Sequence, residues 1–201
     1  MVASGKPSVF VATKEPSLPK TSDNFNDSRL GLQWQWCHNP ANDYWSLTER
    51  KGWLTIHALP SPDLKNARNM LTQKTMGYQG QATTVMDCRS IAQGTFAGLL
   101  CVGRQYRGIG VSADGIYLEN DGQRQVVSSR KPSKVWLRLS LDLHTSHSFQ
   151  FYYSLDGKHF TAAGTPFHMH SGNWKGVRLG LYCYGQQGKA QFDTFHYDIL
   201  K

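Results

Sequence analysis

Three tryptophans and several amide side chains lie close together between residues 30 and 50 of the chain. Trp34, Trp36 and Trp45 supply flat apolar rings, and Asn39 lies among them with other uncharged hydrogen-bonding groups. A pyranose sugar has an apolar C–H face that stacks on an aromatic ring and an equator of hydroxyls that bind amides. This composition therefore indicates a surface that binds sugars.

The same tryptophans also have a purely structural interpretation. Trp34 and Trp36 are two residues apart, so both point to one face of a strand. Tryptophan pairs with this spacing are more often part of the core of a β-sandwich than a ligand platform. The spacing leaves both interpretations open.

The acidic residues near the tryptophans do not form a catalytic pair. Glycoside hydrolysis requires two carboxyl groups held roughly 5–9.5 Å apart across the bond that is cleaved. Asp43 and Glu49 are the acids close to the cluster, and an Asn-Asp turn and an ion pair of Glu49 with Arg50 explain them without catalysis. We predict that the chain has no catalytic residues and is not an enzyme.

Residue types that ligate metals are present but sparse. Two pairs of histidines lack the third ligand that a zinc site requires. Asp23, Asp27 and Asp193 are the carboxylates that would hold a structural calcium ion, although no loop has the dense carboxylates of a typical calcium site. We expect no metal site and no cofactor, with structural Ca²⁺ as the alternative.

Three segments predict strands that have one apolar and one polar face. They cover residues 134–143, 148–154 and 177–184. If these strands are neighbours in one sheet, their outer faces combine into a polar surface lined with aromatic rings. The alternative is that the same side chains form cross-strand pairs that cover the sheet without binding a ligand. The outer residues that would contact a ligand are Arg138, Tyr152, Arg178, Tyr182 and Tyr184.

The chain as a whole has the composition of an all-β protein. It has 19 glycines, 12% aromatic residues and no sustained helical periodicity, and Asp-Gly pairs at residues 114–115 and 121–122 favour hairpin turns. We predict one domain over residues 23–201, a two-sheet antiparallel jelly-roll sandwich. Residues 1–22 contain three prolines and predict a linker or N-terminal arm.

The formal net charge of +8 raises the question of an anionic partner. The lysines and arginines are scattered and form no stripe, which argues against nucleic acid and favours a solvated basic surface. Weak attraction to an acidic glucuronoxylan is the functional alternative. No run of roughly 18 apolar residues is present, so we expect no membrane partner. The four cysteines have no CxxC spacing, which predicts buried thiols.

Six further motifs follow one another along the chain. They are residues 30–40 (LGLQWQWCHNP), 45–50 (WSLTER), 67–75 (ARNMLTQKT), 97–99 (AGL), 153–157 (YSLDG) and 192–195 (FDTF). In this order they resemble the C-terminal β-sandwich module of family 43 glycoside hydrolases, the β-xylosidase and arabinofuranosidase group. Such modules are also classed as carbohydrate-binding module family 91. Cys37 stands where the family usually has asparagine.

The resemblance implies a concanavalin A-like fold, xylan or xylo-oligosaccharides as ligand, and a separate propeller domain that carries the catalytic acids. It also implies an aromatic side chain that reaches over to close the propeller's active-site pocket, and Trp174, in a glycine-flanked loop, is the candidate. We expect a non-catalytic carbohydrate-binding module. The alternative is an accessory structural domain that docks on a family 43 propeller and completes its pocket.

The candidate binding residues combine rings for stacking with polar groups that would fix sugar hydroxyls. They are Trp34, Trp36, Asn39, Trp45, Arg50, Arg138, Tyr152, Trp174, Arg178, Tyr182 and Tyr184. A plant polysaccharide as ligand favours an extracellular or periplasmic location over the cytoplasm.

Overall fold

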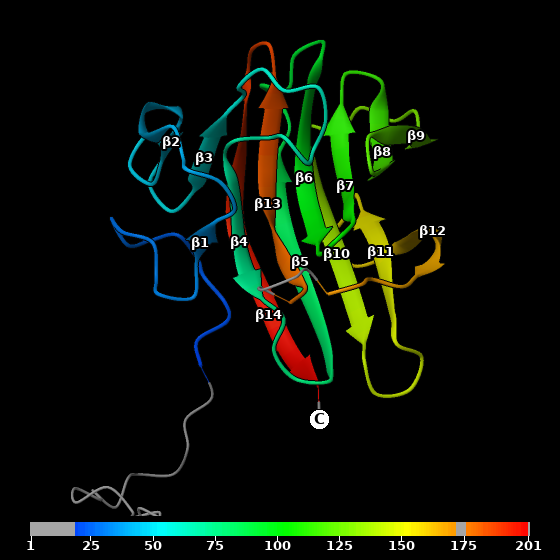
Figure 1. The fold of residues 1–201 in the computed structure, drawn as a ribbon. Coiled ribbons are helices and arrows are strands. Elements are labelled where there is room, and N and C mark those ends of the chain that lie inside the picture. Colours follow the sequence, from blue (N-terminus) through cyan, green and yellow to red (C-terminus); the bar gives the residue numbers. More distant parts are fainter. Residues whose placement is uncertain (1–18, 172–175, 201) are drawn as a thin grey trace, which may run out of the picture.

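The computed structural model describes residues 19–171 and 176–200, which form two seven-stranded antiparallel sheets packed face to face (Figure 1). The predicted all-β, concanavalin A-like jelly-roll sandwich is therefore confirmed. Within the described ranges, the one helical element is a short 3-10 turn, Asn42–Tyr44. None of these residues forms a helix long and apolar enough to cross a membrane.

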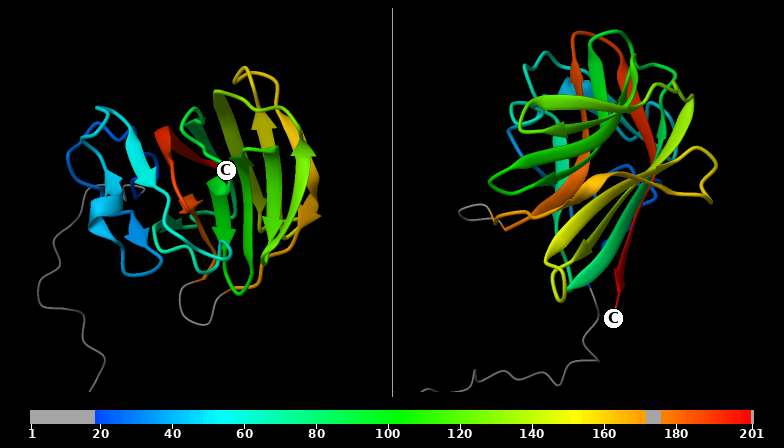
Figure 2. Two further views of the ribbon diagram at one scale, coloured as in Figure 1. Left: turned by 90° about the horizontal axis from the view of Figure 1, so that it is seen from above. Right: turned by 90° about the vertical axis from the view of Figure 1, so that its right-hand side faces the viewer.

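The strands of each sheet follow an order that differs from their order in the chain. The first sheet runs β1 (Gln35–Trp36), β4 (Met70–Lys74), β13 (Arg178–Gly185), β6 (Thr95–Val102), β7 (Tyr106–Ser112), β8 (Gly115–Asn120) and β9 (Gln123–Ser128). The second runs β12 (Thr161–Phe167), β11 (Ser148–Ser154), β10 (Lys134–Asp142), β5 (Gln79–Asp87), β14 (Lys189–Leu200), β3 (Leu54–His57) and β2 (Trp45–Ser46). Strands β1 and β2 lie at one side of the sandwich, and β9 and β12 lie at the opposite side (Figures 1 and 2).

Alternating side chains of the central strands fill the space between the sheets. Leu137 and Leu139 of β10 are completely buried, as are Leu179 and Leu181 of β13, and all four belong to one apolar core. Successive residues of a strand point to opposite faces, so the alternation in the sequence predicts this core correctly.

The three strands with alternating faces are not all neighbours in one sheet, so the condition for a single combined surface is not met. Strands β10 and β11 are neighbours, and Arg138 lies opposite Tyr152 across their pairing. Strand β13, however, lies between β4 and β6 in the other sheet. Alternation tells which residues of one strand share a face but does not tell which strands pair, and this is why the sequence could not place β13.

The outer face of the first sheet is covered by residues 59–69, which we call the covering loop. The loop crosses in front of β13 and β6 (Figure 1). Its Leu64 and Ala67 pack with Tyr182 and Tyr184 of β13 in a second apolar cluster, separate from the core between the sheets. The part of this face around Tyr182 and Tyr184 is therefore closed to solvent.

A buried carboxylate fixes the covering loop to the sheet. Glu119 of β8 is 1% exposed, and it accepts hydrogen bonds from the Leu64 N–H (2.9 Å) and from the Tyr184 hydroxyl. The hydroxyl groups of Tyr117 and Tyr182 share a further hydrogen bond of 2.9 Å. Burial raises the pKa of Tyr182 well above its ordinary value. The tyrosine hydroxyls of this face are thus buried and hydrogen-bonded within the protein.

Trp34 belongs to the core, as the structural interpretation of the tryptophan pair predicts. Its ring centroid lies 5.9 Å from that of Phe25 and 5.0 Å from that of Phe195. Its indole N–H donates to Asp23 Oδ2 at 2.8 Å, and the backbone of Asp23 pairs with Phe195 in β14. Trp34 therefore anchors the start of the described chain to the second sheet.

Candidate functional site

The predicted binding residues differ widely in their exposure. Those that are buried are Trp34, Arg178, Tyr182 and Tyr184. Those of intermediate exposure are Trp36, Trp45, Arg50, Arg138 and Tyr152. Asn39 is exposed, and Trp174 lies outside the described residues.

Tyr182 and Tyr184 point outward from the core as predicted, but they are not exposed. Both side chains do point away from the core between the sheets, but they are 0% and 1% exposed because the covering loop lies over them. No face of either ring is accessible to a sugar. Arg178, on the same face of β13, is 4% exposed.

The outer face of the second sheet brings two predicted residues together. Arg138 lies opposite Tyr152, donates from Nε to Thr83 Oγ1 at 3.1 Å, and places its guanidinium 3.4 Å from the ring centroid of Phe160. Burial lowers the pKa of Arg138. Trp136, two residues earlier in β10, has Lys134 Nζ at 4.6 Å from its ring.

A glycine turn holds the Trp136 ring in place on this face. Gly157 has a φ of 74°, and a Cβ atom at this position would lie 2.8 Å from Trp136 Cε2. A side chain there would displace the ring and would strain the backbone. Half-buried rings and a guanidinium thus form a polar, aromatic surface over β10 and β11.

Arg50 is held by protein groups near the Lys134 end of β10. It donates to Asp87 at 2.8 Å and to Gln191 at 3.1 Å, and its guanidinium lies 3.5 Å from the ring centroid of Trp53. The predicted ion pair between Glu49 and Arg50 is wrong, because Glu49 pairs with His57 and Lys189 instead. Hydrogen bonds from Arg89 hold the pKa of Asp87 well below its usual range.

Trp36 and Trp45 form a smaller aromatic pair at the β1 and β2 edges. Their ring centroids are 5.1 Å apart, and the Trp45 indole N–H donates to Asn42 at 3.2 Å. The backbone carbonyl of Asn39 accepts a hydrogen bond from Arg68 at 2.9 Å, and its side chain is exposed. These residues lie near one another, as their spacing in the sequence predicts.

A groove of about 420 Å³, which we call the Arg178 groove, lies beside β1, β4 and β13. Its lining includes Lys20, Leu32, Gln35, Gln73, Lys74 and Arg178, and contains no carboxylate. Arg178 donates from Nη1 to Gln35 Oε1 at 2.5 Å and from Nη2 to the Thr72 carbonyl at 3.3 Å, while its buried Nε has no hydrogen-bond partner among the described residues. Burial lowers the pKa of Arg178. Leu32 at the rim is fully exposed.

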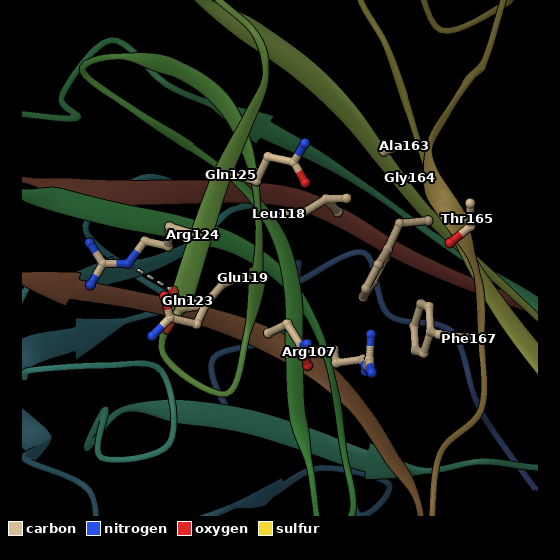
Figure 3. A pocket seen from close by; sticks show the side chains of 12 residues that line it. Arg107, Leu118, Glu119, Gln123, Arg124, Gln125, Ala163, Gly164, Thr165 and Phe167 are labelled. Carbon is tan, nitrogen blue, oxygen red and sulfur yellow. Dashed lines mark ion pairs between the residues drawn. The ribbon is translucent and has the colours of Figure 1, made fainter.

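A second cavity, the open-edge cleft, lies at the opposite side of the sandwich between the β8–β9 hairpin and β12 (Figure 3). Its volume is about 300 Å³. The side chains that line it include Arg107, Glu119, Gln123, Arg124, Gln125, Thr165 and Phe167. Sequence analysis missed this cleft, because its residues come from strands of different sheets, and no spacing along the chain shows that these strands meet.

Of the three carboxylates named as calcium ligands, Asp23 is used within the protein. The Asp23 carboxylate accepts hydrogen bonds from the backbone N–H of Phe25 and from the side chains of Gln33 and Trp34. Within residues 19–171 and 176–200, no three His, Cys, Asp or Glu side chains form a group that could hold a metal ion.

Comparison with known proteins identifies the fold family. Residues 22–198 match the family model of the β-xylosidase C-terminal concanavalin A-like domain. A relative from Xylanibacter ruminicola is 42% identical over 181 residues, which are 90% of this chain and 34% of that protein. The β-xylosidase of Formosa agariphila is 32% identical over 213 residues, covering 90% of this chain and 36% of that enzyme.

A solved structure agrees with the sequence comparison. The bifunctional GH43-CE protein of Bacteroides eggerthii superposes with a TM-score of 0.82 at 32% identity, over 90% of this chain and 26% of that one. The chain thus spans about a third of the length of the curated relatives it matches, and the described residues form a sandwich without a catalytic propeller. This chain belongs to the family of β-xylosidase C-terminal concanavalin A-like domains.

Proposed function

We propose that this sandwich is a non-catalytic accessory domain that docks on a family 43 catalytic domain through the Arg178 groove. The observation that carries the proposal is a buried guanidinium with an N–H that has no partner among residues 19–171 and 176–200, in a groove with no carboxylate among its described lining residues. Burying a charge is costly unless the charge is paired and hydrogen-bonded. A carboxylate from a partner would supply the acceptor that the groove lacks.

The rim of the groove gives the partner a second contact. A single exposed leucine is ordinary on a protein surface, but Leu32 lies directly beside the Arg178 groove, with Lys20 and Lys74 among the lining residues. The groove therefore fits an apolar side chain next to an acidic one. Because the relatives are about three times as long as this chain, the remaining part of such an enzyme is the partner that we propose.

We expect Leu32→Asp to weaken docking by roughly 30-fold, since an apolar side chain that becomes buried in an interface can contribute about 2 kcal/mol or more. An aspartate removes the apolar contact and places a negative charge beside the partner's acid. The measurement is the affinity of this domain for the part of the Xylanibacter ruminicola relative that it does not cover, by calorimetry or biolayer interferometry.

The matched control is Val126→Asp, which changes an exposed apolar residue on β9, at the opposite edge of the sandwich. It should leave the affinity unchanged. Arg178→Lys, which keeps the charge but removes the forked donors, should weaken docking without unfolding the domain. Equal affinities for all three variants would rule out the Arg178 groove as the docking surface.

A second candidate function is binding of xylan or xylo-oligosaccharides on the outer face of the second sheet. The observation that favours it is the row of half-buried rings and a guanidinium formed by Trp136, Arg138, Tyr152 and Phe160. Rings would stack on the apolar sugar face, and Arg138 would bind hydroxyls.

Affinity electrophoresis in gels with soluble xylan, arabinoxylan or mixed-linkage glucan tests this second function. We expect retardation by the xylans, reduced about 2- to 12-fold in Tyr152→Ala, because one solvent-competed contact contributes roughly 0.5–1.5 kcal/mol. Tyr44→Ala is the control, since Tyr44 is exposed in the 3-10 turn beside β2, at the other edge of the second sheet from β10 and β11. Unchanged migration of the original protein in every gel would exclude this function.

A further inference from the structure

The open-edge cleft has the size and location of an independent ligand site. It lies between β7, β8 and β9 of the first sheet and β11 and β12 of the second, whereas the Arg178 groove lies at the β1 and β4 side. Ligand pockets in proteins have volumes of roughly 300–1,000 Å³. At about 300 Å³, the cleft fits a ligand of one or two sugar rings.

Arg107 is a cation in the cleft that has no acidic partner in the part of the chain that the structure describes. Its guanidinium lies 4.8 Å from the ring centroid of Phe167, and its buried Nε makes no hydrogen bond to any described residue. No carboxylate of the described chain lies within ion-pair distance of it, whereas Arg124 pairs with Glu119 at 3.4 Å. Figure 3 shows Arg107 beside Phe167 on the cavity side, away from the Arg124–Glu119 pair.

The charge balance of the cleft favours an anion. Glu119 is compensated by Arg124 and also accepts hydrogen bonds from Tyr184 and from the Leu64 N–H. The charge of Arg107 therefore remains uncompensated. A guanidinium presents its donors in a planar fork that matches the two oxygens of a carboxylate.

The other polar side chains of the cleft match sugar hydroxyls. Gln123 and Gln125 of β9 and Thr165 of β12 line the cavity, and Gln125 and Thr165 lie on opposite sides of it (Figure 3). All three residues are exposed, and their side chains form no hydrogen bonds with the rest of the described chain. An amide both donates and accepts, as a hydroxyl does, so these groups suit the alternating donors and acceptors of a sugar.

We infer that the open-edge cleft binds a sugar that bears a carboxylate, such as a uronic acid substituent of an acidic glycan. The carboxylate pairs with Arg107, and Gln123, Gln125 and Thr165 bind the hydroxyls. The net charge of +8 attracts such a ligand at long range. This site goes beyond the proposed docking function and does not depend on it.

The test compares an acid with its neutral derivative. Calorimetry of the 201-residue chain is carried out with xylotriose that bears one glucuronic acid, with the methyl ester of the same compound, and with unsubstituted xylotriose. We expect the acid to bind at least 10-fold more tightly than the ester. Equal affinities for acid and ester would overturn the proposal.

Three variants assign the binding to the cleft. Arg107→Gln should abolish the preference for the acid, and Arg29→Gln should keep it, because Arg29 is exposed and does not line the cleft. Gln125 is exposed, so Gln125→Ala should leave folding unchanged. It should lower the affinity for the acid and for the ester alike, by 2- to 5-fold.

The remaining outcomes separate this site from the alternatives. A preference for the acid that survives Arg107→Gln would contradict the proposal. So would competition by inorganic phosphate or duplex DNA as strong as that by the uronic acid, since it would indicate general attraction of anions. Loss of docking in Leu32→Asp with an unchanged preference for the acid would show that the two sites are separate.

Discussion

Replacement of Glu119 by alanine is expected to lower the free energy of unfolding by about 3 kcal/mol. The carboxylate accepts hydrogen bonds from the Leu64 N–H and the Tyr184 hydroxyl, and both donors are buried. Alanine leaves them without an acceptor, and each buried donor that loses its partner costs roughly 1–3 kcal/mol. Denaturant unfolding followed by circular dichroism measures the change.

The control for this variant is Glu49→Ala. Glu49 pairs with His57 and Lys189 at the surface, where such ion pairs contribute less than about 1 kcal/mol. Trypsin provides a second measurement, because Lys65 and Arg68 are exposed in the covering loop. Glu119→Ala should be cleaved there faster than the original protein. Equal stability of the two glutamate variants would contradict the anchoring of the loop by Glu119.

Trp34→Ala is expected to destabilise the domain by about 3–5 kcal/mol, the usual cost of truncating a buried tryptophan. The indole packs against Phe25 and Phe195, and its N–H is the donor to Asp23. Alanine would leave a cavity between these rings and an unpaired acceptor. Thermal and denaturant unfolding would both detect the loss.

Trp136→Ala is the matched tryptophan control. Trp136 is half-buried on the outer face of the second sheet, so its truncation should cost about 1 kcal/mol. Similar losses for the two variants would contradict the assignment of Trp34 to the core. The comparison also matters for binding experiments, since reduced binding by Trp34→Ala would reflect unfolding rather than the loss of a stacking platform.

The strand alternation and the family motifs predict the fold well. In β10 the apolar positions Val135, Leu137 and Leu139 are buried as predicted, because period-two alternation reports directly which face of a strand meets the core. The motifs between residues 30 and 195 predict the β-xylosidase C-terminal family, and the match over residues 22–198 confirms it. Both signals are local in the sequence.

The candidate sites were harder to predict because exposure depends on distant segments. Alternation correctly places Tyr182 and Tyr184 opposite Leu181, but only the position of Leu64, more than 100 residues earlier, decides that they are buried. In the same way, Arg107 and Phe167 come from different sheets, and no spacing along the chain reveals that they meet. The exposure and the neighbours of a residue therefore depend on strand pairing and loop paths, which the local sequence does not reveal.

The location of the two candidate sites at opposite edges of the sandwich has a geometric consequence. Neighbouring strands are about 4.8 Å apart, so a seven-stranded sheet is roughly 30 Å wide. An acidic branch bound in the open-edge cleft would tether its glycan chain within about this distance of a docked catalytic domain. Such tethering would raise the effective concentration of glycan chain ends near the active site. Compared with short oligosaccharides, polymers long enough to span the domain would then be the better substrates.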